Sequence, residues 1–359
     1  MLDVVDKKGS VPIYVQLKRT LRAAILDGTL ADRAPSERGL ARRYDVAQMT
    51  ARRAIMELVD EGFLYRQVGR GTFVRRPGSA VPKTFTLAFV LHPGVSEGLR
   101  NPYFSGVLQG VEEAARGEGY SLVYTSSLEE LIDGPDDPQR GGRKADGVLA
   151  VALADEGAVR RAARVVPTVV LDNEFDGMEC VVVDNVSGAR MAVSHLAGLG
   201  HRRIGHLAGP RASAVGRGRL AGYRSALAEH GLPYDPGCVH DGWFTYDSGA
   251  AGVDWLIDRP DRPTAIFCAN DAVALGAMKR LRRRGLSVPG DVSLVGFDDI
   301  EPARMVDPGL TTVRVPRKAL GVLAVDVLLS LIRGDGEGRA AGRHLVDVQL
   351  VERASCRRI

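Results

Sequence analysis

Arginine and hydrogen-bonding side chains recur at short intervals between Pro35 and Val74. Arg38, Arg52 and Arg70 each carry a planar guanidinium that can donate hydrogen bonds to phosphate groups or to base edges. Residues 1–80 hold 15 lysines and arginines against 9 carboxylates, whereas the other residues hold 33 against 35. A basic segment on a nearly neutral chain favours a polyanion as its partner. Taken alone, any one of these arginines is better explained as ordinary surface charge.

A second group of polar and aromatic side chains follows apolar runs later in the chain. The candidates stand where buried strands would end: Tyr103 after the run 86–91, Asp172 after 168–171, Asn270 after 265–268 and Asp298 after 292–296. Ligands of parallel α/β sheets bind at the carboxyl ends of the strands. Aromatic planes beside hydrogen-bonding groups suit a sugar or a nucleoside. Asn270 is also a good helix N-cap, and the two roles are compatible.

Three helices are predicted for the basic segment. The first covers residues 12–27, the second begins after the N-cap Ser36, and the third covers 47–61. A tight turn joins the last two, and a helix pair of this kind places its second helix in the major groove of DNA. Such helices read bases with their N-terminal residues, which here include Thr50, Arg52 and Arg53.

A two-stranded ribbon is predicted after the third helix, from residues 63–65 and 72–74. Gly69 permits a tight tip that approaches DNA closely, and Arg70 next to it can reach phosphate. The segment 77–83 is rich in proline and glycine and has no apolar period, which is typical of a linker. We therefore predict a DNA-binding domain over residues 1–76 and a second domain over 84–359.

The segment from Pro12 to Val74 resembles the winged helix-turn-helix domain of GntR-type bacterial regulators. The stretches PSER, TxRRAxxELxxEG and GRGTFV occur in the same order and spacing. This resemblance implies that Arg38, Arg52 and Gly69 stand on DNA-contacting positions. It also places Gln48 and Thr50 on the recognition helix. The chain departs from the family at residues 47–48, where Ala-Gln replaces the usual Ser-Arg.

From residue 84 onward, apolar runs alternate with helical patterns. Strands are predicted at 86–91, 121–124, 148–151, 168–171, 180–183, 204–207, 265–268 and 292–296, and helices at 103–115, 188–199, 219–230, 248–258 and 272–284. This alternation predicts an α/β fold with two parallel sheets. Two such sheets that face each other enclose a cleft.

Residues 84–356 resemble the effector domain of LacI-type repressors, which is related to periplasmic sugar-binding proteins. The stretches NPYFSGVLQGVEEAA, PTAIFCANDAVALGA and VPGDVSLVGFDD carry the resemblance. It implies two Rossmann-like lobes and a homodimer. It also implies an effector cleft lined by Tyr103, Arg219, Phe244, Asn270 and Asp298, with Asp172 as a weaker candidate. Arg219 and Asp298 would grip the ligand together, although Arg219 is also compatible with an internal ion pair.

Other classes of function find less support in the sequence. No nucleophile–base pair, paired carboxylates, metal-ligand spacing or cofactor loop is recognisable, so we expect no catalysis, cofactor or metal. No apolar run approaches the roughly 20 residues of a membrane span, and the first ten residues are polar, so we expect the cytoplasm. The leading hypothesis is a DNA-binding transcriptional regulator, in the manner of arabinose-type repressors, controlled by a sugar or related metabolite. The alternative is a sugar-binding protein without a DNA function.

Overall fold

The computed structural model describes residues 11–26, 29–30, 33–60, 63–67, 71–74, 84–95, 97–128, 131, 145–335 and 341–359. The chain divides into two compact units, which we call the head unit (1–86 with 129–146) and the effector unit (87–128 with 147–359). Each unit has a hydrophobic core of its own. The predicted linker, residues 77–83, lies outside the described residues.

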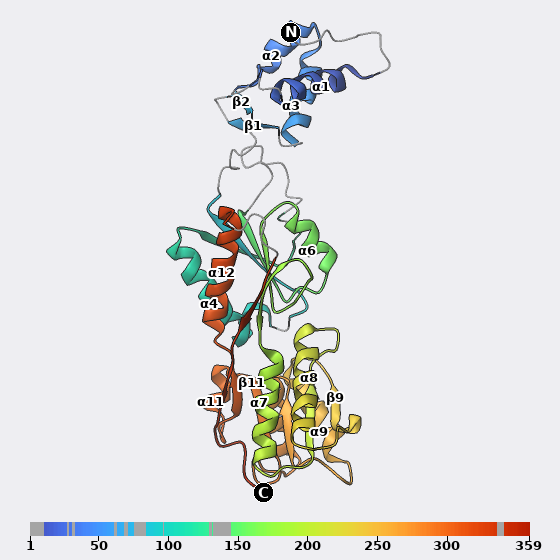
Figure 1. Ribbon diagram of the computed structural model, residues 1–359, viewed down its shortest axis with the longest axis vertical. Helices are drawn as coiled ribbons and strands as arrows, with labels where there is room; N and C mark the ends of the chain where they lie inside the picture. Colours follow the sequence, from blue (N-terminus) through green and yellow to red (C-terminus); the bar gives the residue numbers. More distant parts are fainter. Residues whose placement is uncertain are drawn as a thin grey trace. The chain divides into compact units, whose positions relative to one another are not determined.

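Between residues 11 and 74, the described part of the head unit forms three helices and a two-stranded antiparallel ribbon (Figure 1). The elements are α1 (Ile13–Leu26), α2 (Glu37–Tyr44), α3 (Gln48–Asp60), β1 (Leu64–Gln67) and β2 (Gly71–Val74). Their apolar side chains converge on Leu17, Leu40, Ile55 and Leu58, all of which are buried. The helical spacing of these residues is the reason that three short amphipathic helices form one core. The predicted order of elements is confirmed.

The effector unit has two lobes, each built on a six-stranded sheet. The strands of the first sheet, in spatial order, are β13 (Arg343–Val346), β7 (Glu179–Val183), β6 (Thr168–Leu171), β5 (Gly147–Val151), β3 (Thr86–Leu91) and β4 (Ser121–Thr125). The order in the second is β14 (Gln349–Val351), β12 (Thr311–Arg314), β11 (Ser293–Asp298), β10 (Ala265–Cys268), β8 (Ile204–Ala208) and β9 (Val239–Asp241). The central strands pair in parallel, and β14 pairs antiparallel to β12. The predicted α/β fold is confirmed.

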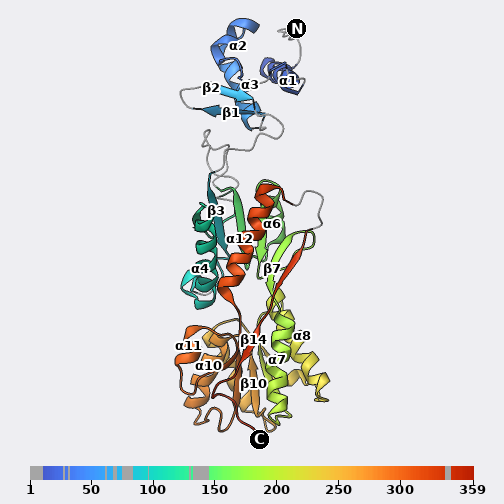
Figure 2. The same cartoon turned by 60° about the vertical axis from the view of Figure 1, so that its left-hand side comes forward.

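Helices cover both faces of each sheet, which is why the central strands are apolar throughout. In the first lobe, α4 (Pro102–Gly117) and α12 (Arg317–Arg333) pack side by side on one face, and α6 (Glu156–Ala163) lies on the other (Figure 1). In the second lobe, α7 (Asn185–Gly198) packs on α8 (Ala214–Glu229), and α9 (Tyr246–Ile257) packs on α10 (Asp271–Arg283). Figure 2 shows α7 and α10 on opposite sides of β10. The short α11 (Glu301–Met305) follows β11.

The chain crosses between the two lobes at several points. It enters the second lobe between β7 and α7, returns to the first between β12 and α12, and enters the second again between β13 and β14. Crossings of this kind form a hinge between two otherwise independent sheets. The carboxyl ends of the central strands of both lobes therefore face one cleft.

Several elements differ from the sequence-based expectation. The predicted strands match β3, β6 and β10 at both ends, and the predicted helices match α4 and α7 to α10 to within a few residues. The prediction missed α6 and α12 and the short strands β9, β12, β13 and β14. The helix α12 is apolar on most of its surface because it packs on α4 and on the first sheet, so its amphipathic period is weak.

Candidate functional site

The amino-terminal end of α2 is fixed by Ser36. Its backbone is extended (φ −63°, ψ 154°), and its Oγ accepts a hydrogen bond from the N–H of Gly39 at 3.0 Å. This is the geometry of a helix N-cap. Arg38 lies in the first turn of the helix and is exposed. Glu37 next to it forms an ion pair with Arg66 of β1, which ties α2 to the ribbon.

The helix α3 presents one buried and one exposed face. Ala51, Ala54, Ile55 and Leu58 are fully buried against α1 and α2. Among the predicted DNA contacts, Gln48 and Arg52 are exposed and Thr50 is half-buried. The side chains that sequence analysis assigned to base reading therefore lie at the amino-terminal end of α3, outside the core.

One further arginine of the head unit is held by an aromatic ring, and the ribbon is held by stacked rings. The Arg53 guanidinium lies 3.8 Å from the centre of the Tyr14 ring and donates a hydrogen bond to its hydroxyl at 3.1 Å. In the ribbon, Tyr65 and Phe73 stack with ring centres 5.7 Å apart. These contacts fix α1 against α3 and β1 against β2. The predicted tip residues Gly69 and Arg70 lie outside the described residues.

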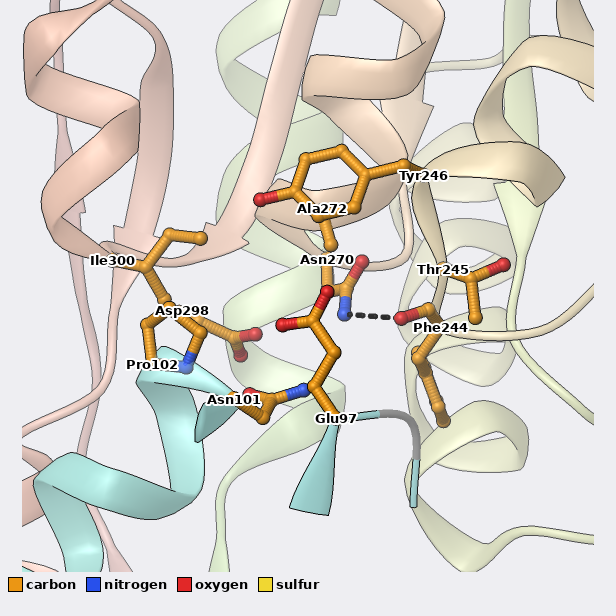
Figure 3. A pocket seen from close by; sticks show the side chains of 10 residues that line it. All are labelled: Glu97, Asn101, Pro102, Phe244, Thr245, Tyr246, Asn270, Ala272, Asp298 and Ile300. Atoms are coloured by element: carbon orange, nitrogen blue, oxygen red, sulfur yellow. Dashed lines mark hydrogen bonds between the residues drawn. The ribbon is translucent and has the colours of Figure 1, made fainter. Parts of the chain in front are cut away.

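The two lobes of the effector unit face each other across a pocket (Figure 3). The first lobe contributes Glu97, Asn101 and Pro102, and the second contributes Phe244, Thr245, Tyr246, Asn270, Ala272, Asp298 and Ile300. The pocket holds about 370 Å³ of space between atoms, counted out to its open mouth.

Arg219 is the most heavily engaged side chain beside the pocket. It is 3% exposed, and its Nη2 pairs with Asp298 Oδ1 at 3.3 Å. Its Nε donates to Asn185 Oδ1 at 2.9 Å, and its Nη1 donates to the carbonyl oxygen of Ala269. The guanidinium lies 3.7 Å from the centre of the Phe297 ring. Because its donors are satisfied from several sides, the charge is rigidly positioned.

Asp298 occupies the end of β11 in an unusual backbone conformation. Its φ is 112°, a region that residues with a side chain rarely adopt. Burial raises the pKa of its carboxyl to about 6, although the Arg219 guanidinium works in the opposite direction. Residues with a strained backbone or a shifted pKa cluster at binding sites, where the rigid surrounding structure holds them in place. Asp298 is therefore a strong candidate for ligand contact.

Tyr103 and Asp172 form a second polar pair, contributed by the first lobe. The Tyr103 hydroxyl donates to Asp172 Oδ1 at 2.9 Å. Burial raises the pKa of Asp172 to about 6, and it also raises the pKa of Tyr103. The negative charge of Asp172 contributes to the raised pKa of Asp298, so the two carboxyls are close enough to interact.

Phe244 and Asn270 complete the predicted set. The Asn270 Oδ1 accepts from the N–H of Val273 at 2.9 Å and caps α10, while its Nδ2 reaches the carbonyl oxygen of Phe244 at 3.5 Å (Figure 3). Asn270 thus caps a helix and lines the pocket. The Phe244 ring covers Gly209, where an added Cβ would lie 2.4 Å from the ring. The flat face that a sugar or base ring needs is therefore fixed in place.

Of the six predicted effector residues, Phe244, Asn270 and Asp298 line the pocket directly. Arg219 is joined to it through its ion pair with Asp298. Sequence analysis missed Asn185, which orients Arg219, and the lining residues Glu97, Thr245 and Tyr246. Asn185 stands just beyond the end of β7, so the strand-end rule could have identified it.

The chemistry of the pocket is that of binding. Amide and carboxylate groups alternate with the aromatic rings of Phe244 and Tyr246, as in sites that take polar ring compounds. Within the described ranges, no group of three or more His, Cys, Asp or Glu side chains is placed to hold a metal ion. None of the helices in those same ranges has the length and apolar character of a bilayer span.

Two family models match this chain. Residues 13–74 match the bacterial regulatory proteins of the gntR family, and residues 193–356 match a periplasmic binding protein-like domain. The first match covers the three helices and the ribbon of the head unit. The second covers the lobe that holds Arg219, Phe244, Asn270 and Asp298.

Named relatives are similar over most of the chain. The HTH-type transcriptional repressor CytR of Escherichia coli (strain K12) is 32% identical over 335 residues, which is 90% of this chain and 92% of that protein. The ribose operon repressor of the same strain is 36% identical over 245 residues, 65% of this chain and 72% of that protein. Among solved structures, a complex of the transcriptional regulator CelR with cellobiose is 28% identical and has a TM-score of 0.69, covering 90% of this chain and all of that one. This chain therefore belongs to the family of helix-turn-helix transcriptional repressors, with a GntR-type DNA-binding domain joined to a LacI-type, periplasmic-binding-protein-like effector domain.

Proposed function

We propose that this protein is a cytoplasmic repressor whose operator binding is controlled by an uncharged sugar or nucleoside. The observation that carries the proposal is the buried Arg219–Asp298 pair. Asp298 lines the pocket, and the Arg219 guanidinium lies 5.8 Å from the centre of the Phe244 ring and 3.7 Å from that of Phe297. The pair offers hydrogen bonds to hydroxyl groups, and Phe244 covers the apolar face of a ring. The similar CelR structure is a complex with cellobiose, which supports a sugar ligand.

The proposed domains are a DNA-binding domain over residues 1–76, a linker over 77–83 and an effector domain over 84–359. The effector domain also forms a homodimer, so two copies of α3 enter successive major grooves of a pseudo-palindromic operator. Ser36, Arg38, Arg52, Gly69 and Arg70 contact the backbone or bases, and Gln48 and Thr50 adjust the sequence preference.

Control of operator binding follows from the two-lobed cleft. A ligand that contacts Asn101 and Glu97 in one lobe and Asp298 in the other binds more tightly when the lobes are closed. It shifts the protein toward the closed state by the difference between its affinities for the two states. In a dimer, that shift changes the separation of the two DNA-binding domains.

A gel-shift titration with ligands tests this proposal. Duplexes enriched from genomic DNA by the full chain are titrated with protein, at fixed salt, with and without pentoses, hexoses, disaccharides and nucleosides. We expect at least one of these compounds to change the operator Kd by tenfold or more and to be recovered unchanged. A compound that binds the chain while no duplex is enriched would support the alternative, a sugar-binding protein without a DNA function. Conversion of the compound would indicate an enzyme.

A further inference from the structure

Met49 is an exposed apolar residue on the surface of the head unit. It is the second residue of α3, and 70% of its surface is exposed. Among the described residues between 11 and 74, no other large hydrophobic side chain is exposed to this degree. A single exposed apolar side chain is common on protein surfaces, so the place of Met49 on α3, and not its exposure alone, has to indicate a partner.

The position of Met49 on the helix is opposite to the core. With 3.6 residues per turn, the buried side chains of Ala51, Ala54, Ile55 and Leu58 share one face of α3. Met49 points the other way, one turn before the exposed Arg52. Because its side chain supports no part of the core, folding provides no reason for a large apolar group at this position.

The charges around Met49 favour a polyanion over an apolar protein surface. Arg38, Arg42 and Arg52 are exposed on α2 and α3. Of the carboxylates described on α2 and α3, Glu37 is paired with Arg66, and Glu57 is paired with Lys18 and Arg53. Asp45 lies in the turn between the two helices. This surface therefore has an excess of positive charge around one apolar side chain. Double-stranded DNA is the occupant with the matching charge.

The major groove offers one apolar group to a protein, the 5-methyl group of thymine. The thioether of methionine is flexible and polarisable, and it adapts to a small apolar partner. We propose that Met49 contacts the methyl group of one thymine in each operator half-site and so selects thymine at that position. The inference rests on the proposed function, and it adds Met49 to the residues that determine sequence specificity.

Uracil-substituted DNA isolates the contribution of the methyl group. An operator is first selected from random-sequence duplexes with the full chain, and each thymine is then replaced in turn by deoxyuridine, which lacks only the methyl. We expect one replacement per half-site to raise the Kd of the wild-type protein roughly fourfold. This ratio corresponds to the free energy of burying one methyl group. Replacing the same thymine by 5-methylcytosine, paired with guanine, keeps the methyl while changing the hydrogen-bonding edge.

Two variants connect the effect to Met49. Met49→Ala should bind the thymine operator several-fold more weakly and bind the thymine and uracil duplexes equally well. Arg19→Ala, at an exposed position on α1, should keep the discrimination. Because neither side chain supports the core, both variants should show the unfolding midpoint of the wild type.

The outcomes separate this inference from the proposed function. If an operator is selected but every thymine tolerates uracil, Met49 does not read a methyl group, and the proposed function stands. If Met49→Ala keeps the discrimination, another residue reads the methyl group and the inference fails. If no sequence is enriched at all, the proposed function itself fails.

Discussion

The head unit and the effector cleft use charged side chains in opposite ways. On α2 and α3, Arg38 and Arg52 are exposed to water. In the cleft, Arg219 and Asp298 are almost fully buried and are paired with each other. An exposed charge attracts a polyanion at little cost to folding, because water solvates it until DNA arrives. A buried charge must be satisfied within the fold before any ligand binds.

This difference determines how each region should respond to substitution. Changes at the exposed arginines should alter DNA binding and leave the fold intact. Changes in the cleft should alter ligand binding and stability together, because the same hydrogen bonds serve both. Single substitutions in the two regions test this difference, and the largest effect is expected in the cleft.

Arg219→Leu should produce the largest effect. It leaves the carboxylate of Asp298 buried without a partner, and breaking a buried pair in this way costs about 3–5 kcal/mol. We expect a lower midpoint of thermal unfolding for the effector unit and loss of effector binding. Calorimetry of the full chain measures the first effect, and titration with the effector measures the second.

The double variant Arg219→Leu with Asp298→Asn provides the control. It removes both charges, so most of the lost stability should return while effector binding stays absent. If Arg219→Leu alone unfolds at the wild-type midpoint, the pair is not a buried charge pair in solution, and the contrast with the head unit fails.

Asp172→Asn should change the pH dependence of stability. Burial raises the pKa of Asp172 to about 6, above its ordinary value of about 4. The protonated carboxyl therefore favours folding below pH 4, and this contribution is lost as the pH rises through 6. Since the amide carries no charge, the variant should unfold like the wild type near pH 4. At pH 8 it should be more stable by on the order of 2–3 kcal/mol.

Thermal unfolding from pH 4 to pH 8 without effector measures this difference. Asp155→Asn is a suitable control, because Asp155 caps α6 through the N–H of Ala158 at 2.9 Å and lies outside the pocket. A constant difference between Asp172→Asn and the wild type at every pH would show that burial of the carboxylate is not the cause.

Ser36→Ala should have the smallest effect on stability. The substitution removes the hydrogen bond from the N–H of Gly39 and should cost about 1 kcal/mol, the usual value for an N-cap. Ser36→Asp restores an acceptor and should recover that stability. Local unfolding of α2, followed by amide hydrogen exchange, is the measurement. Unchanged exchange in Ser36→Ala would mean that the cap contributes nothing in solution.

The same contrast explains how much of the molecule the sequence could predict. In the head unit, helix caps, the apolar period and the recognition residues are all local in sequence, so α1, α2 and α3 were predicted in the right order. In the effector unit, the apolar runs of β3, β6 and β10 identify buried strands by themselves. The strand-end rule then indicated Asp172, Asn270 and Asp298.

The features that the sequence did not predict depend on distant contacts. The helix α12 is apolar on most sides because it packs on both α4 and the first sheet, and no local period identifies it. The strands β13 and β14 pair with neighbours that are far away in the chain. The bond from Arg219 to Asn185 likewise depends on how α7 and α8 pack together. Such partners follow from the fold and not from residue type.

Paired binding measurements on Arg52→Ala test the central claim most directly, namely that an exposed DNA-reading surface and a buried effector cleft are separate modules. Operator and effector affinities are measured at one salt concentration, with Arg19→Ala on α1 as the control for a lost exposed charge. We expect Arg52→Ala to weaken operator binding about 10- to 100-fold, which is the range for a lost base or phosphate contact. The effector Kd should stay unchanged within about twofold. Equal losses of both affinities, or no loss of operator binding, would contradict this claim.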